Sequence, residues 1–164
     1  MITRRRLLTT VTTTLAGLTA GLVTARQASA ETVGDVEVMR FPGDPTDHNV
    51  VYQFNKAEQS YHNGVLFSVA EVLRKYNDNV TIVVTAIGPG LHILAKKPLR
   101  TVSEHTKEKV KSLADYGIRF HACGNTMKSL NWTKDDLHDF VEVVNVGAVD
   151  LMELQEQGYS YISW

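Results

Sequence analysis

The stretch Val80-Thr81-Ile82-Val83-Val84-Thr85-Ala86-Ile87 is a nearly continuous apolar run in which every residue except Ala86 is β-branched. A strand of this kind is typical of a parallel sheet, because helices cover both of its faces and no polar alternation remains. Gly88-Pro89-Gly90 follows directly and ends the strand. The run therefore predicts a central strand of an α/β fold.

Strand and helix patterns alternate on either side of this run. The expected strands are 49–54, 80–87, 118–122, 141–146 and 159–162. The expected helices are 58–76, 103–116 and 148–157, with short helical pieces near 91–95 and 126–130. This rhythm predicts an α/β domain, a three-layer α/β/α sandwich with a mainly parallel five-stranded sheet.

The first 30 residues have the pattern of a secretory signal. Three arginines at 4–6 precede an uncharged segment at 7–25, and Ala28-Ser29-Ala30 provides a cleavage site of small residues. Paired arginines before a weakly apolar segment resemble a twin-arginine signal. A membrane anchor is the alternative, but the many Thr and Gly residues make a poor membrane helix. We expect cleavage, a periplasmic or otherwise exported protein, an irregular lead-in at 31–48 and one domain at 49–164.

The charge of the chain excludes some classes of partner. The whole sequence has 17 basic and 18 acidic residues. Removing the four arginines of the signal leaves 13 basic residues against 18 acidic ones, a formal net charge of −5. Such a domain has no electrostatic reason to bind nucleic acid. We also expect no stable membrane insertion after cleavage.

Cys123 is the only cysteine of the chain, and it follows the expected strand 118–122. Exported proteins commonly use cysteines in pairs, so a lone thiol indicates an intermolecular bond, a reactive thiol or a buried inert one. Open α/β sheets bind ligands at the carboxyl ends of their strands. Gly124 allows close backbone approach, and a short helix after it would aim amides at the sulfur. Cys123 is our candidate nucleophile, and a buried small hydrophobe is the alternative.

His121 lies two residues before Cys123 and therefore shares its face of the strand. It is a candidate to sense or activate the thiol, and an ordinary polar strand residue is the alternative. Arg119 shares the same face, and we interpret it as an ordinary surface residue. His121 and Cys123 could also supply two ligands to copper or zinc, but no second pair has ligand spacing. We therefore expect no resident metal and no cofactor.

Gly88 and Gly90 follow the second expected strand. Together with Gly124 and Asn125, they are our candidate ligand-binding residues. The loops after the second, third and fourth strands can meet at one edge of the sheet, which favours a single site. A phosphate loop is disfavoured, because the longer glycine pattern and the lysine of such loops are missing. A tight turn after the strand is the alternative interpretation.

Three segments together resemble the DsrE/DsrF-like family of sulfur-relay proteins. They are Gly-Ile-Arg-Phe-His-Ala-Cys-Gly-Asn-Thr-Met at 117–127, Val-Asn-Val-Gly-Ala-Val at 144–149 and Glu-Leu-Gln-Glu-Gln-Gly-Tyr-Ser-Tyr-Ile at 153–162. The resemblance extends from about Val50 to Ile162. It implies a small three-layer α/β/α domain that assembles as a homotrimer, a homohexamer or a related hetero-oligomer. It also implies that one cysteine accepts sulfane sulfur as a persulfide, and Cys123 occupies that place.

These observations lead to two hypotheses about function. The first is a periplasmic sulfur carrier or sulfurtransferase-like protein, with Cys123 tuned by His121 and by the amides of Gly124 and Asn125. Its sulfur donor and acceptor are unknown, and an exported member would need partners other than those of cytoplasmic relay proteins. The second is a non-catalytic oligomeric module that binds a small ligand or a metal at the same site. A thioredoxin-type redox enzyme is poorly supported, because the chain has no Cys-x-x-Cys motif.

Overall fold

The structure is a computed structural model and describes residues 44–164 of the chain. The expected signal at 1–30, and the lead-in up to residue 43, lie outside the described residues. The strands are β1 (His48–Phe54), β2 (Val80–Ala86), β3 (Arg119–Cys123), β4 (Val141–Val144) and β5 (Ser160–Ile162). The helices are α1 (Gln59–Tyr76), α2 (Glu104–Asp115), α3 (Gly124–Leu130) and α4 (Gly147–Glu156), with 3₁₀ helices η1 (Gly88–Leu94) and η2 (Lys134–Asp136).

The five strands form one sheet in the order β4-β3-β2-β1-β5. Every neighbouring pair is parallel, so the expected mainly parallel sheet is confirmed and is parallel throughout. β2 lies at the centre and is paired along its length with β1, which explains its continuous apolar sequence. The carboxyl ends of β2, β3 and β4 therefore meet at one edge of the sheet.

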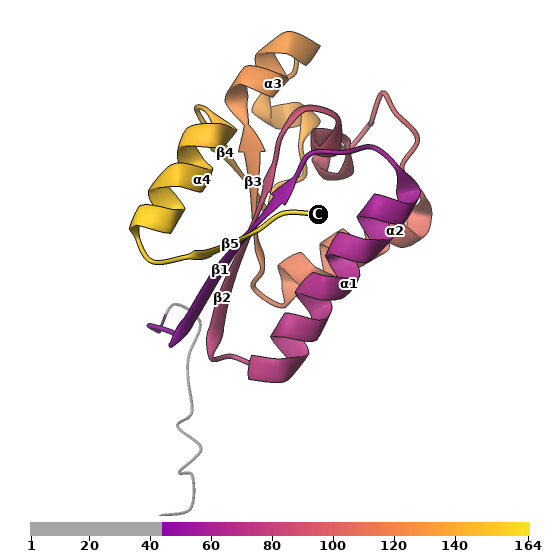
Figure 1. Cartoon of the computed structure of the whole chain (residues 1–164). Coiled ribbons are helices and arrows are strands. Elements are labelled where there is room, and N and C mark those ends of the chain that lie inside the picture. Colours follow the sequence, from indigo (N-terminus) through magenta and orange to yellow (C-terminus); the bar gives the residue numbers. More distant parts are fainter. Residues whose placement is uncertain (1–43) are drawn as a thin grey trace, which may run out of the picture. The chain divides into compact units, whose positions relative to one another are not determined.

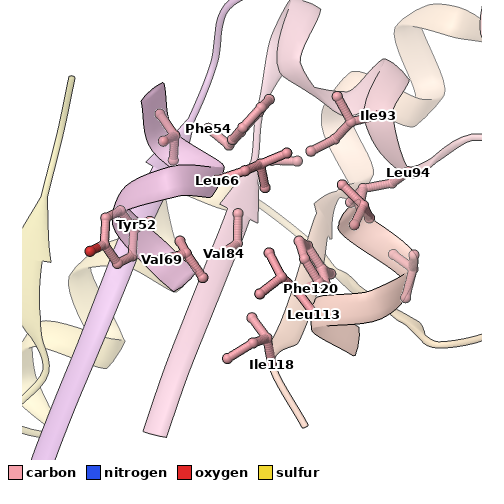
Figure 2. Packing of buried hydrophobic residues seen from close by; sticks show 14 of the residues in the cluster. Tyr52, Phe54, Leu66, Val69, Val84, Ile93, Leu94, Leu113, Ile118 and Phe120 are labelled. Carbon is pink, nitrogen blue, oxygen red and sulfur yellow. The ribbon is translucent and has the colours of Figure 1, made fainter. Parts of the chain in front are cut away.

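Helices cover both faces of this sheet. α1 and α2 lie on one face and α4 lies on the other (Figure 1). The larger core lies under α1 and α2, where Tyr52, Leu66, Val84, Leu113 and Phe120 pack together (Figure 2). The core on the opposite face is smaller, and consists of four buried residues: Val51, Val83, Leu151 and Leu154. The α/β sandwich is confirmed, and α4 faces the odd-numbered residues of β3.

The segment after β2 differs in detail from a simple turn. η1 begins at Gly88 itself, whose φ of 54° is in the left-handed region that favours glycine. Gly90 lies so close to β1 that a Cβ atom there would be 2.2 Å from the carbonyl oxygen of Phe54. η1 then buries Leu91, Ile93 and Leu94 in the core. The glycines thus allow η1 to pack against the end of β1.

The elements around Cys123 also differ slightly from expectation. Cys123 is the last residue of β3, and α3 begins at the next residue rather than at 126. β4 ends at Val144, two residues earlier than expected. Within residues 44–164, no helix combines the length and the apolar character needed to cross a membrane.

Candidate functional site

Cys123 lies where the amino ends of two helices meet. It is the N-cap residue of α3, and its Sγ accepts a hydrogen bond of 3.2 Å from the amide of Gly147, the first residue of α4. Its relative exposure is only 4%. Amide groups at a helix amino end are free to donate, so this position favours a negatively charged sulfur.

Two glycines make this close approach possible. A Cβ atom on Gly147 would be 2.7 Å from Cγ1 of Ile87 and 3.0 Å from Cβ of Cys123. A Cβ atom on Gly124 would be 2.9 Å from the carbonyl oxygen of Val144. Any larger residue at either position would therefore push α4 or the end of β4 away from the sulfur.

The surroundings of the thiol lower its pKa. Burial alone raises the pKa of Cys123, but hydrogen bonds outweigh it. They come from the amide of Gly147, the hydroxyl and amide of Thr126, and the amide of Asn125, and together they bring the pKa below its usual value of 9.0. The amide of Asn125 is among these donors and that of Gly124 is not, and α4 contributes the amide of Gly147.

The two glycines after β2 have different relations to the site. The amide of Gly88 donates to Oγ1 of Thr126 at 3.0 Å, which links the β2 loop to the group that hydrogen-bonds the sulfur. Gly90 instead packs against the backbone of Phe54. The structure therefore connects Gly88 to Cys123 through Thr126 and gives Gly90 a packing role.

His121 is buried on the same face as Cys123 and makes contacts of its own. Its Nδ1 is 2.9 Å and 3.0 Å from the two carboxylate oxygens of Asp150 in α4. Asp150 also accepts a hydrogen bond of 2.6 Å from the hydroxyl of Thr85. No hydrogen bond is found between His121 and Cys123 within the described residues, so any influence of His121 on the thiol acts through space.

The other nitrogen of His121 faces the edge of the sheet. Nε2 is 3.5 Å from Oε2 of Glu142 in β4, and this nitrogen has no hydrogen-bond partner within the described part of the chain. Arg119 is exposed and pairs with the same carboxylate at 3.2 Å. The surface interpretation of Arg119 agrees with this position.

Sequence reasoning singled out neither Thr85 nor Asp150. Each carries a weak signal in the sequence, because Thr85 is polar within an apolar strand and Asp150 is the acidic residue in the first turn of α4. An acid at that position also suits the helix dipole, so the sequence alone does not separate the two roles. The pairing of β2 with β3 places Thr85 beside His121, and the packing of α4 on these strands brings Asp150 to both residues.

A cavity of about 310 Å³ opens beside this cluster. It lies between the end of β4 and α4, and its lining residues are Val143, Val144, Asn145, Val146, Val149, Asp150 and Glu153. Among residues 44–164, no three His, Cys, Asp or Glu side chains are grouped as a metal site requires. The wall of the cavity is therefore mixed, with four valines, the Asn145 amide and the carboxylates of Asp150 and Glu153.

The family model described as the DsrE/DsrF-like family matches residues 48–164. The chain belongs to the DsrE/DsrF-like family. The match covers all five strands and therefore includes the whole site described above. Membership supports a function of the sulfur-relay type at the level of the family.

Two solved structures of similar fold agree with this assignment. One is a protein of unknown function, MTH1491 from Methanobacterium thermoautotrophicum, with a TM-score of 0.65 and 28% identity over 72% of this chain and 100% of that one. The other is the ychN protein from E. coli, with a TM-score of 0.59 and 13% identity over 71% of this chain and 99% of that one. At 13% identity the second shows the fold alone. No curated protein sequence matches the chain.

Proposed function

We propose that this DsrE/DsrF-like protein carries sulfane sulfur as a persulfide on Cys123. The observation that carries the proposal is the hydrogen bond of 3.2 Å from the Gly147 amide to Sγ. The Thr126 hydroxyl and the amides of Thr126 and Asn125 add to it in lowering the pKa of Cys123. These donors favour the thiolate, which is the nucleophilic form of cysteine. They would equally favour the negative charge of a bound persulfide.

The transfer can be written so that atoms and electrons balance. The Cys123 thiolate attacks the outer sulfur of a donor such as thiosulfate, a new S–S bond forms, and the donor's S–S bond breaks. The electron pair of that bond leaves with the departing group, which is sulfite in the case of thiosulfate. An acceptor thiolate then attacks the outer sulfur of the persulfide and releases the Cys123 thiolate. The chain contains one cysteine, so no second thiol of the same chain can resolve the persulfide as a disulfide.

The burial of the thiol limits the donors that can react. With a relative exposure of 4%, Cys123 presents little of its surface to solvent. Thiosulfate and short polysulfides are small enough to reach the sulfur of Cys123. A persulfide on another protein would reach it only if the surrounding loops opened. We therefore expect loading by small inorganic donors to be the simpler reaction to observe.

Intact-protein mass spectrometry tests the proposal. The protein is incubated with thiosulfate or polysulfide, and we expect an added mass of one sulfur atom that maps to Cys123 and disappears on reduction. Cys123→Ser is the matched control and should take up nothing. If no donor adds sulfur to the wild-type protein, sulfur carriage is wrong.

A non-catalytic module that binds a small ligand is the second candidate. The burial of the thiol and the cavity of about 310 Å³, which Asp150 lines and Cys123 does not, favour it. Thiol labelling separates the two candidates. Sulfur carriage requires that a small reagent modify Cys123 in the native protein. Labelling that occurs only after denaturation would favour the binding module.

The same proposal includes export and self-assembly. The N-terminal pattern of arginines, weakly apolar segment and small residues supports export to the periplasm. Val143 and Val149, which line the cavity, are 42% and 40% exposed, and Met152 of α4 is 51% exposed. Exposed apolar groups of this kind support contact with another protein surface. We propose a homotrimer or homohexamer whose sulfur donor and acceptor differ from those of cytoplasmic members.

A further inference from the structure

Asp150, Thr85 and His121 form a second polar cluster near the thiol, and each comes from a different element. Asp150 lies in α4 and contacts Thr85 of β2 and His121 of β3. The Asp150 side chain is 11% exposed and that of His121 is 3% exposed. None of these hydrogen bonds involves Cys123. The cluster is therefore separate from the groups that lower the pKa of the thiol, and its role needs an explanation of its own.

The contacts of Asp150 determine which nitrogen of His121 carries a proton. Burial raises the pKa of Asp150, but hydrogen bonds from His121 and Thr85 outweigh burial and hold the pKa below its usual value of 3.8. Asp150 is thus a carboxylate at neutral pH and can only accept hydrogen bonds. The nitrogen that faces it, Nδ1, must therefore be the donor.

Nε2 is then the nitrogen left to exchange a proton. In a neutral imidazole with hydrogen on Nδ1, Nε2 has a free lone pair. Nε2 has no hydrogen-bond partner within the described residues and lies 3.5 Å from Oε2 of Glu142. The side chain of Glu142 is 58% exposed, so this nitrogen lies next to a group in contact with solvent.

We infer that Asp150 is a positioning residue that holds His121 in the Nδ1–H tautomer, so that Nε2 is the atom that takes up a proton at this site. The tautomer follows from geometry alone, whereas its use in sulfur loading rests on the proposed function. His121 is two residues before Cys123 on one strand face, about 6.6 Å along the strand. When Cys123 attacks a hydropersulfide donor, R–S–SH, Nε2 takes the proton of the outer sulfur and returns it to the departing R–S⁻. The products are the Cys123 persulfide anion and R–SH.

Nitrogen-15 NMR of the histidines in the exported protein tests the tautomer directly. His121→Gln identifies the His121 signals by their loss, and we expect the wild-type protein to have hydrogen on Nδ1. Asp150→Asn should reduce the population of this tautomer, because an amide can also donate to Nδ1, and Asp150→Glu should restore part of it. Asp115→Asn is the matched control, since Asp115 is 62% exposed and, among residues 44–164, forms its ion pair with Lys111 alone. A wild-type His121 with hydrogen on Nε2 overturns the inference without any variant.

The rate of sulfur loading tests the role of the pair. Partners that orient metal-bound histidines are commonly worth about 10- to 100-fold in affinity or activity, and we use that scale for the Asp150–His121 pair. With glutathione hydropersulfide as the donor, which is of the R–S–SH type, we expect Asp150→Asn to slow persulfide formation on Cys123 by about that factor, with loading still complete at long times. Loading of this variant at the wild-type rate overturns the positioning role even if sulfur carriage is correct. If the wild-type protein takes up no sulfur at all, sulfur carriage fails, and the NMR result alone decides the assignment of Asp150.

Discussion

At the scale of single residues, Cys123 is subject to two opposite influences. Burial disfavours a charged sulfur, and the donors around it favour one. Most of those donors are main-chain amides, which only a substitution by proline would delete, and the hydroxyl of Thr126 is the side-chain exception. Thr126 also accepts from the amide of Gly88, so one hydroxyl connects the loop after β2 with the reactive atom.

Replacing Thr126 by Val should therefore raise the pKa of Cys123. In the wild-type protein the thiolate appears at lower pH than in a free cysteine, and loss of the hydroxyl moves its appearance to higher pH. The ultraviolet absorbance of the thiolate, followed against pH, measures this change even for a buried sulfur. Val also leaves the amide of Gly88 without its acceptor, which should cost about 1–3 kcal/mol of unfolding free energy. Thr126→Ser keeps a hydroxyl and is the control, and an unchanged titration in Thr126→Val would contradict the assignment.

At the scale of the elements, the position of α4 determines the site. Gly147 allows the first turn of α4 to approach Cys123 and Ile87, and Asp150 in the same turn reaches β2 and β3. α4 is fixed to the sheet by Leu151 and Leu154 against Val51 and Val83. This small core therefore holds both the amide that contacts the sulfur and the carboxylate that contacts His121.

A pair of glycine substitutions distinguishes the close packing of Gly147 from the general effect of glycine on helix stability. Gly147→Ala places a methyl group 2.7 Å from Ile87 and should destabilise the fold by about 1–3 kcal/mol while weakening the amide–sulfur hydrogen bond. Gly64→Ala in α1 places its methyl group 3.7 Å from the ring of Trp164, an ordinary contact, and should stabilise the helix by about 0.5–1 kcal/mol. Denaturant unfolding measures both. Equal effects of the two substitutions would mean that α4 is not closely packed at Gly147.

The elements also show what the sequence could predict and what it could not. The continuous apolar run at 80–87 identified a buried parallel strand, because periodicity reports how each face is covered. The position of Cys123 at the end of its strand followed from the same local reasoning. The contact between Asp150 and His121 could not be predicted, because it depends on how α4 lies across the sheet. For the same reason the donor to the sulfur from α4, Gly147, was missed, although its loop was expected at the site.

At the scale of the whole molecule, the proposed export would place one buried thiol in an oxidising compartment. Cys123 has no partner for an internal disulfide, and its burial keeps it away from the thiols of other proteins. The twin-arginine route carries proteins that are already folded, so a protein exported in this way would cross the membrane with its thiol already protected. The general secretory route would instead deliver an unfolded chain with an exposed thiol.

This reasoning predicts that export depends on the arginines at 4–6 themselves and not only on their charge. Changing these three residues to lysine keeps the positive charge but removes the arginine pair, so we expect the uncleaved chain of 164 residues to remain in the cytoplasm. Arg26→Lys lies outside the pair and should leave export unchanged. Cell fractionation and the intact mass of the wild-type protein measure the outcome, with a mature chain that begins at Glu31. Equal export of the triple-lysine variant would indicate the general secretory route, and Cys123 would then have to fold into its buried position after crossing the membrane.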